Sequence, residues 1–301
     1  MIEVVEAGRW TTIQDRGRPG LERFGIPSGG AADWFAAAVA NRLVGNHEDA
    51  ALLECTAAVP TLLFEADAVI ALTGGQSAGV ANWQAVPISR GSSLAVGTIA
   101  PGLRSYIAVR GGIDVPLVLG SRSFCQRGTF GGGFGRPLAK GDGLAIGRMT
   151  ELEAIPTPWP ESHRLQARGP WEVRVIAGPQ RDAFSADALQ RLGATACRVT
   201  PEIDRMGLRL ETPGLRLQPQ EILTVPMTAG SIQVTPSGGL IVLHVDHQST
   251  GGYPVIATVI SADLPLLAQA RPGDTVRFRS VDLAEAARAW RRLIGWLELD
   301  R

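Results

Sequence analysis

The stretch from Gly230 to Pro254 constrains the fold most, because it contains two strand-like runs joined by a tight turn. Ile232 to Thr235 alternates between apolar and polar residues, as a strand does, and Leu240 to Val245 is a continuous apolar run that contains His244. The residues between them, Pro-Ser-Gly-Gly, are typical of a turn. The stretch therefore predicts two neighbouring β-strands, of which the second is buried.

A polar loop follows the second run directly. Its sequence is Asp246-His247-Gln248-Ser249-Thr250, and Gly251-Gly252-Tyr253-Pro254 completes it. Loops on a rigid scaffold often carry binding or catalytic residues. We interpret this loop as part of a functional site, and an ordinary hairpin with a solvated loop is the alternative.

Composition extends the β-rich prediction to the whole chain. The 301 residues include 36 glycines and 20 prolines but only 6% aromatic residues, which favours short strands joined by turns. Each half opens and closes alike: Glu3 to Gly8 resembles Val173 to Gly178, and Lys140 to Leu144 resembles Arg271 to Val276. Prolines gather just before residue 160. We therefore predict two similar β-domains, 1–160 and 170–301, the second ending in a helix.

Charge and cysteine usage exclude several functional classes. Basic and acidic residues balance at 29 each, and no basic run carries interleaved aromatic residues, so nucleic acid is not an expected partner. The three cysteines are widely spaced and the histidines lack zinc-site spacing, so no metal is predicted. No leader pattern or long apolar run occurs, which predicts a soluble cytoplasmic protein without membrane contact.

Two glycine-containing motifs could signal catalysis or nucleotide binding. Gly75-Gln76-Ser77-Ala78-Gly79 fits G-x-S-x-G, but Asn82, Pro87 and Gly91 interrupt the helix that a nucleophile elbow requires, so we interpret the match as chance. The loop from Gly128 to Arg136 is glycine-rich, yet neither phosphate-binding glycine motif occurs in the chain. Any ATP site is therefore expected to be unconventional or shared with another chain.

Polar loops supply the candidate site residues. The planar guanidinium of an arginine can donate two parallel hydrogen bonds to a substrate carboxylate. An aspartate beside glutamine and tyrosine donors can transfer a proton during a reaction at a carbonyl group. Ion pairs within a β-barrel use the same residue types, so a structural role is the alternative for each. Asp33 and Asn41 are expected on one face of a helix from Ala31 to Val44, with Asp33 in its first turn. The candidates are Gln14, Asp15, Arg18, Ser28, Asp33, Asn41, Arg205, Gln233, Asp246, Gln248 and Tyr253.

The order of these loops is more specific than any one of them, and it resembles the biotin-dependent carboxyltransferase-like family. That family includes the C subunit of 5-oxoprolinase (KipA), allophanate hydrolase subunit 2 and the matching part of urea carboxylase. The matching stretches cover nearly the whole chain; they include Thr12 to Arg18, Gly25 to Gly29, Ala40 to Asn46, Val109 to Ile113, Gly120 to Ser123, Asp204 to Gly207, Gly230 to Val234, Asp246 to Pro254 and Pro272 to Asp274. Phe124 and Gln76-Ser77 depart from the family pattern and leave the substrate open.

The resemblance implies a mainly β fold of two tandem cyclophilin-like β-barrel domains with a few short helices. It also implies work with a KipI-like partner and a LamB/YcsF-like partner in the ATP-dependent opening of 5-oxoproline to glutamate. In that reaction Asp15, Asp246, Gln248 and Tyr253 are expected around the lactam, and Arg18 or Arg205 at its carboxylate. The remaining candidates, Gln14, Ser28, Asp33, Asn41 and Gln233, are expected to bind substrate.

Two other functions stay open at this point. One is a carboxyltransferase component that acts on urea or a similar amide and uses carboxybiotin. The other is a non-catalytic regulator that binds a KipI-like kinase inhibitor. If the chain has the 5-oxoproline-opening function that the resemblance implies, replacing Asp246 by Asn is expected to abolish activity while the fold survives.

Overall fold

The computed structural model describes residues 1–95, 97–148, 156–212 and 222–298, which form two compact units. Unit 1 consists of Met1–Pro19 and Gly29–Ala167, and unit 2 of Gly20–Ser28 and Arg168–Arg301. The break after Ala167 lies between the predicted domains. The nine residues of Gly20–Ser28, however, belong to the unit formed by the other half of the chain. A division of the sequence into two consecutive domains does not anticipate this segment.

Unit 1 is built from two antiparallel sheets, with strand orders β7-β4-β1-β9 and β2-β3-β8-β5-β6. Alternate residues of both sheets face a shared apolar core that includes Ile2, Phe64, Ile70 and Ile107. The strands are β1 (Ile2–Glu6), β2 (Trp10–Gln14), β3 (Leu52–Thr56), β4 (Thr61–Phe64), β5 (Ala68–Gly74), β6 (Ala85–Ile88), β7 (Ser93–Leu94), β8 (Arg104–Val109) and β9 (Gly143–Leu144).

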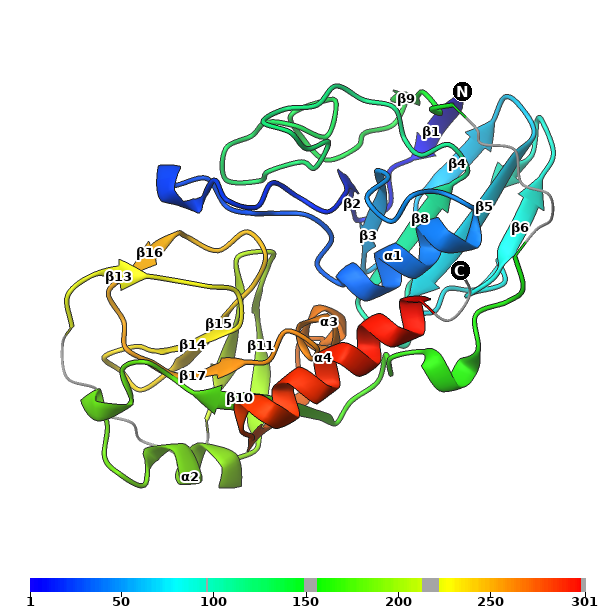
Figure 1. The fold of residues 1–301 in the computed structure, drawn as a ribbon. Coiled ribbons are helices and arrows are strands. Elements are labelled where there is room, and N and C mark those ends of the chain that lie inside the picture. Colours follow the sequence, from blue (N-terminus) through cyan, green and yellow to red (C-terminus); the bar gives the residue numbers. More distant parts are fainter. Residues whose placement is uncertain (96, 149–155, 213–221, 299–301) are drawn as a thin grey trace. The chain divides into compact units, whose positions relative to one another are not determined.

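Helix α1 (Trp34–Leu43) packs on β5 and β8 in unit 1 (Figure 1). It begins later than predicted, because Asp33 is the N-cap residue and its Oδ1 accepts the Ala36 N–H at 2.9 Å. Asp33 therefore lies before the first turn rather than in it. Unit 1 also contains the short 3₁₀ helix η2 (Glu161–His163).

Unit 2 is a closed barrel with strand order β10-β17-β14-β15-β12-β11-β18, in which β10 and β18 run parallel. Trp171, Val173, Ile232, Val242 and Phe278 are among the buried residues that fill it. The prediction of a mainly β chain is confirmed, and one of the two expected β-barrels is the closed barrel of unit 2, whereas the strands of unit 1 form two sheets. The strands are β10 (Trp171–Ala177), β11 (Cys197–Ile203), β12 (Gly207–Glu211), β14 (Ser231–Val234), β15 (Leu240–Leu243), β17 (Val255–Val259) and β18 (Thr275–Ser280), beside a small sheet of β13 (Val225–Pro226) and β16 (Thr250–Gly251).

Short helices surround the barrel of unit 2. Helix α2 (Ala188–Ala194) packs against β17 and β18, and α3 (Leu264–Gln269) packs against β10. The last helix, α4 (Leu283–Glu298), agrees with the helix predicted at the end of the second domain, and it buries Leu293 and Leu297 on one face. Two 3₁₀ helices, η1 (Glu22–Phe24) and η3 (Arg181–Ala183), complete the unit.

The two glycine-aspartate turns that suggested a repeat make equivalent contacts in the two units. In unit 1, Val4 donates its N–H to Asp142 and accepts from Gly141. In unit 2, Val199 donates to Asp274 and accepts from Gly273. Val4 lies in the opening strand of its unit, whereas Val199 lies in the second strand of the barrel. The repeated sequence therefore marks the same local turn at different positions in the two strand orders.

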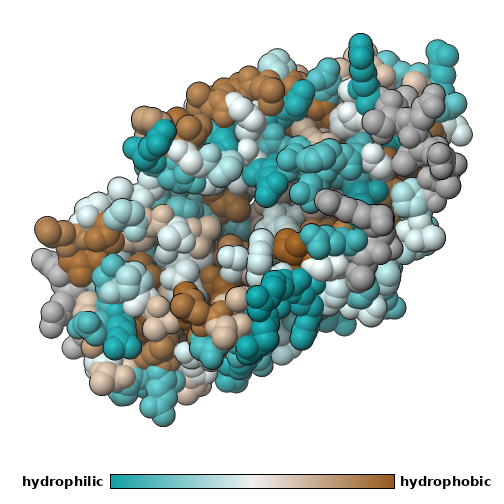
Figure 2. Space-filling model, in the orientation of Figure 1, coloured by the Kyte–Doolittle hydropathy of each residue, from teal (hydrophilic) through white to brown (hydrophobic). Residues whose placement is uncertain are grey.

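One surface of unit 1 is apolar. Figure 2 shows a hydrophobic area along the upper edge, where Figure 1 draws the long loop between β8 and β9. Leu117 and Leu119 of this loop are 58% and 52% exposed. Among the described residues, no helix has both the length and the apolar character needed to cross a bilayer.

Candidate functional site

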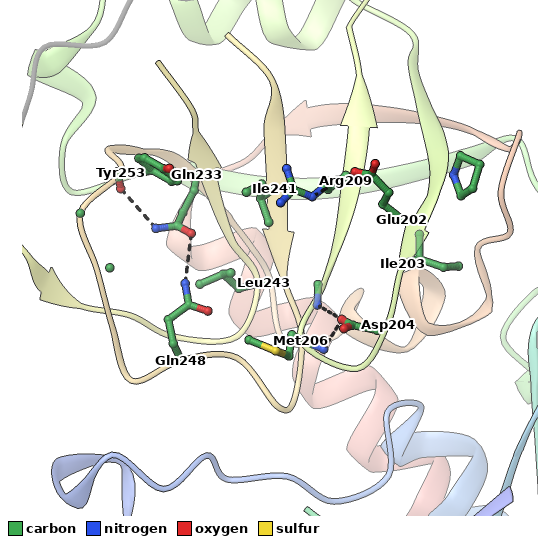
Figure 3. A pocket seen from close by; sticks show the side chains of 14 residues that line it. Glu202, Ile203, Asp204, Met206, Arg209, Gln233, Ile241, Leu243, Gln248 and Tyr253 are labelled. Atoms are coloured by element: carbon green, nitrogen blue, oxygen red, sulfur yellow. Dashed lines mark hydrogen bonds and ion pairs between the residues drawn. The ribbon is translucent and has the colours of Figure 1, made fainter. Parts of the chain in front are cut away.

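A cavity of about 490 Å³ opens on the outer face of the barrel in unit 2 (Figure 3). Residues of β12, β14 and β15 form its floor, because alternate side chains of these strands point away from the barrel core. The end of β11, the loop after it and the loop before β17 form its walls. The lining residues are Pro201, Glu202, Ile203, Asp204, Met206, Gly207, Arg209, Gln233, Ile241, Leu243, Gln248, Gly251, Gly252 and Tyr253.

Two carboxamides face each other on one side of the cavity (Figure 3). Gln248 donates from Nε2 to Oε1 of Gln233 over 3.4 Å, and Gln233 donates to the carbonyl of Tyr253 over 3.4 Å. Gln233 is 1% exposed, whereas Tyr253 is 41% exposed and lies at the mouth. The structure therefore brings three predicted site residues together, and one hairpin with its following loop supplies them.

The other side of the cavity carries charge. The Nε of Arg209 lies 3.2 Å from a carboxylate oxygen of Glu202, and both side chains are largely exposed. The Asp204 carboxylate accepts the backbone N–H groups of Met206 and Gly207 at 2.7 and 3.1 Å, which fixes the turn between β11 and β12. Apolar Ile241 and Leu243 separate this charged side from the two carboxamides (Figure 3).

Arg205 and Asp246 pair with each other beneath the loops of unit 2. Arg205 Nε and Nη2 donate to the two carboxylate oxygens of Asp246 at 2.8 and 3.1 Å, and neither side chain is more than 3% exposed. The backbone N–H of Asp246 also donates to the carbonyl of Arg205 at 2.9 Å. Neither residue lines the cavity. The pair joins the turn before β12 to the polar loop after β15, and so holds the two walls together.

Ser28 lies in the segment Gly20–Ser28 that joins unit 2. Its hydroxyl donates to the carboxylate of Glu22, which also accepts the N–H of Gly20 at 2.8 Å. Burial opposes ionisation of Glu22, but the hydrogen bonds from Ser28 and from backbone N–H groups hold its pKa below the ordinary value. The buried His247 adds a smaller electrostatic effect in the same direction. Ser28 thus fixes the inserted segment through Glu22.

Asp15 of unit 1 accepts four hydrogen bonds at 2.6 to 2.7 Å. Ser121 Oγ, Ser123 Oγ and the Gly17 N–H donate to Oδ1, and the Arg122 N–H donates to Oδ2. These bonds tie the end of β2 to a loop more than 100 residues later. The carboxylate is therefore engaged in holding the loop 121–123.

The other candidates of unit 1 also contact their own unit. Arg18 donates to the Ser123 carbonyl at 2.6 Å, with its guanidinium 5.1 Å from the ring centroid of Phe130. Gln14 donates to the carbonyl of Phe124 at 3.2 Å. The Asn41 carboxamide donates to the carbonyl groups of residues 48 and 50, beyond the end of α1. Asn41 and the capping Asp33 thus serve the two ends of α1.

The glycine-rich loop does not form an open cradle for phosphate. A Cβ at Gly131 would lie 2.2 Å from the carbonyl oxygen of Ser123, and one at Gly133 would lie 2.7 Å from the side chain of Val115. These glycines are therefore required for packing against the loop's own neighbours.

The region after Gly75 agrees with the interpretation of the G-x-S-x-G match as chance. The chain after Gly75 forms turns and isolated bridges before β6, so the helix of a nucleophile elbow is absent there. Over the described residues, no three His, Cys, Asp or Glu side chains are close enough together to hold a metal ion.

Sequence reasoning missed Arg209, Ile241 and Leu243. Arg209 occupies an outward position of β12, between the buried Leu208 and Leu210, which is ordinary for a barrel strand. The signal was in β15, where Leu-Ile-Val-Leu is apolar on both faces. An outward Ile241 on a barrel strand indicates that something covers the outer surface there.

Comparison with known proteins adds a family match and near-full-length relatives. The carboxyltransferase domain, subdomain A and B, matches residues 24–280. The C subunit of 5-oxoprolinase from Escherichia coli is 36% identical over 303 residues, which cover 96% of this chain and 94% of that protein. Urea amidolyase of Saccharomyces cerevisiae is 32% identical over 301 residues, 92% of this chain but 16% of its own length. The crystal structure of Kluyveromyces lactis urea carboxylase has a TM-score of 0.92 at 30% identity, covering 99% of this chain and 29% of that one.

Proposed function

The chain belongs to the carboxyltransferase domain family, subdomain A and B, and on that premise we propose that it is the C subunit of an ATP-dependent 5-oxoprolinase. The observation that carries the proposal is its alignment with the C subunit of the Escherichia coli 5-oxoprolinase over 96% of this chain and 94% of the relative. Urea amidolyase matches over a similar stretch of this chain, but this chain spans only 16% of that protein. The 36% identity to the oxoprolinase subunit also exceeds the 32% identity to urea amidolyase.

The reaction is hydrolysis of the ring amide of 5-oxoproline to glutamate. Water supplies a hydroxyl to the carbonyl carbon and a proton to the nitrogen as the C–N bond breaks. The cavity of unit 2 supports a substrate-holding role for this chain, because Gln233 and Gln248 present amide donors and acceptors beside an apolar floor. Tyr253, which also lines the cavity, has a side chain that is 41% exposed.

The buried aspartates have a different proposed role. Asp246 and Arg205 neutralise each other and join the cavity walls, so we propose that they position Gln248 rather than contact substrate. Asp15 is engaged by four hydrogen bonds in unit 1. The catalytic role expected for both aspartates, and the substrate contacts expected for Gln14, Arg18, Ser28, Asp33 and Asn41, stay predictions.

ATP and partner subunits complete the proposed enzyme. Hydrolysis of ATP to ADP and phosphate supplies the driving force for opening the lactam, and the glycine loop of this chain is packed against its own neighbours rather than open to phosphates. We propose that a KipI-like subunit supplies most of the nucleotide contacts. A LamB/YcsF-like subunit then completes hydrolysis.

A carboxyltransferase component acting on urea is the second candidate. The match to urea amidolyase and the 0.92 TM-score with urea carboxylase favour it. It requires carboxybiotin as the donor of the carboxyl group, whereas the oxoprolinase does not. The third function, a regulator that binds a KipI-like kinase inhibitor, differs from both in having no turnover.

Co-expression separates these three functions. The tagged chain is purified with its KipI-like and LamB/YcsF-like partners, and the complex is given either 5-oxoproline with ATP or urea with carboxybiotin. Glutamate from 5-oxoproline supports the proposal. Carboxylation of urea supports the carboxyltransferase, and a stable complex without either product supports the regulator.

A further inference from the structure

Three strands place the polar groups of the cavity at one level of the barrel. Gln233 of β14 is the register partner of Ile241 of β15, and Ile241 is in turn the partner of Arg209 of β12. Neighbouring strands lie about 4.8 Å apart, so the backbones of Gln233 and Arg209 are about 10 Å apart across the floor. A small molecule lying on Ile241 is therefore within reach of both side chains.

The Gln233 carboxamide is buried but weakly bonded. It is 1% exposed. Its Nε2 donates to the carbonyl oxygen of Tyr253 and its Oε1 accepts from Nε2 of Gln248, and both distances are 3.4 Å. Its remaining contact is to the sulfur of Met227 at 3.6 Å. Good amide hydrogen bonds measure about 2.7–3.2 Å. A buried carboxamide at these distances gains free energy when a ligand offers shorter bonds.

A ring amide has the complementary shape. Its C=O and N–H lie on the same edge, unlike those of a trans peptide, and together they match the N–H and C=O of a primary carboxamide. Two parallel hydrogen bonds form between such edges. Ile241 and Leu243 offer an apolar surface for the carbon atoms of the ring.

Arg209 supplies the group that a carboxylate requires. Its Nε pairs with Glu202 at 3.2 Å, but the two side chains are 55% and 71% exposed, so this ion pair is weak. A ligand carboxylate competes with it and accepts hydrogen bonds from the planar guanidinium. The distance from the carboxamides to Arg209 thus selects a ring amide that also bears an acid.

We infer that this cavity binds a small lactam acid, with Gln233 and Gln248 at its amide edge and Arg209 at its carboxylate. The inference rests on the proposed function for the choice of 5-oxoproline among such molecules. It assigns a specificity-determining role to Arg209 and locates the binding site within unit 2 alone.

Gly251 keeps the loop close to the amide-binding side. A Cβ at this position would lie 2.6 Å from Gln233 Nε2 and 3.1 Å from the side chain of Met227. Replacing Gly251 by Ala therefore displaces the Gln233 carboxamide without removing any polar group. We expect this variant to weaken binding of every ligand that carries the amide edge.

Binding measurements with three ligands test the separate roles. The full chain is titrated calorimetrically with 5-oxoproline, with 2-pyrrolidone, which lacks the carboxylate, and with cyclopentanecarboxylate, which lacks the amide. Arg209→Gln is expected to weaken the binding of 5-oxoproline and of cyclopentanecarboxylate about tenfold and to leave the affinity for 2-pyrrolidone unchanged. Gln233→Leu is expected to weaken the binding of 5-oxoproline and of 2-pyrrolidone about tenfold and to leave the affinity for cyclopentanecarboxylate unchanged.

Matched controls separate binding from folding. Arg198→Gln removes an exposed ion pair of the same barrel, with Glu211, that does not line the cavity, so it is expected to change no affinity. If Gln233→Leu has a lower melting temperature than the wild type, the variant Gln248→Leu, at a half-buried position, is measured in its place. Equal weakening of all three ligands by Arg209→Gln, or no effect of either glutamine variant, overturns the inference.

The outcome is distinguishable from failure of the proposed function. If the assembled enzyme forms glutamate but Gln233→Leu, Gln248→Leu and Arg209→Gln leave its KM for 5-oxoproline unchanged, the inference is wrong and the proposed function stands. If the ligand pattern is found but the assembly forms no glutamate, the proposed function fails and the binding site stands. Absence of saturable 5-oxoproline binding by the chain and by its complex also overturns the inference.

Discussion

Replacement of Asp246 by Asn is expected to destabilise unit 2, and its effect follows from the ion pair with Arg205. The asparagine keeps one acceptor oxygen, loses one hydrogen bond and removes the negative charge that Asp246 places beside a guanidinium that is 3% exposed. Removing one member of such a buried pair costs about 3–5 kcal/mol. Domains have about 5–15 kcal/mol of stability, so the melting temperature falls by roughly 10–20 °C.

Thermal and urea unfolding, followed by circular dichroism and tryptophan fluorescence, measure this loss. Glu211→Gln breaks the exposed ion pair with Arg198 in the same barrel and is expected to cost less than about 1 kcal/mol. A double-mutant cycle with Arg205→Met and Asp246→Leu should give a coupling energy of about 2 kcal/mol or more. Wild-type stability of Asp246→Asn, with activity abolished, would refute this reasoning and restore a catalytic role for Asp246.

Three further predictions concern groups whose environment the structure defines. Two hydrogen bonds from Arg136 hold the pKa of Asp142 below its ordinary value. The ionised carboxylate therefore stabilises the fold fully above about pH 4, and this stabilisation is lost as the pH falls through the lowered pKa. The free energies of unfolding of wild type and Asp142→Asn in urea should differ at neutral pH and converge in acid. Burial raises the pKa of Cys197 to about 11, so this thiol should react with a disulfide reagent at pH 8 about 100-fold more slowly in the native chain than after denaturation; equal rates would contradict its burial. Asp15→Asn should cost about 3 kcal/mol, because the Asn amide faces a backbone N–H donor, whereas Asp114→Asn, in an exposed ion pair of the same loop region, should cost under about 1 kcal/mol in the same urea titration.

Local patterns in the sequence predicted local structure well. The two runs around the Pro-Ser-Gly-Gly turn became β14 and β15 within one or two residues of the expected bounds. The same hairpin and its loop brought Gln233, Gln248 and Tyr253 to one cavity, because all three are close in sequence. Alternation and turn residues suffice where the partners are neighbours along the chain.

Contacts between distant residues account for what the sequence did not predict. Arg205 and Asp246 are 41 residues apart, and nothing in either loop indicates that each is the other's partner. Asp15 is held by residues 106 to 108 positions later. Polar residue types alone did not separate these buried pairs from a substrate site, since both use the same chemistry.

Titration of this chain into its partner subunits tests the central claim most directly. Glutamate formation from 5-oxoproline and ATP is measured at fixed KipI-like and LamB/YcsF-like subunits as the chain is added. The account predicts no glutamate without the chain and a rise to a plateau when it equals its partners in amount. Glutamate formed at the same rate without the chain, or none at any amount of it, would contradict the assignment as the C subunit of a 5-oxoprolinase.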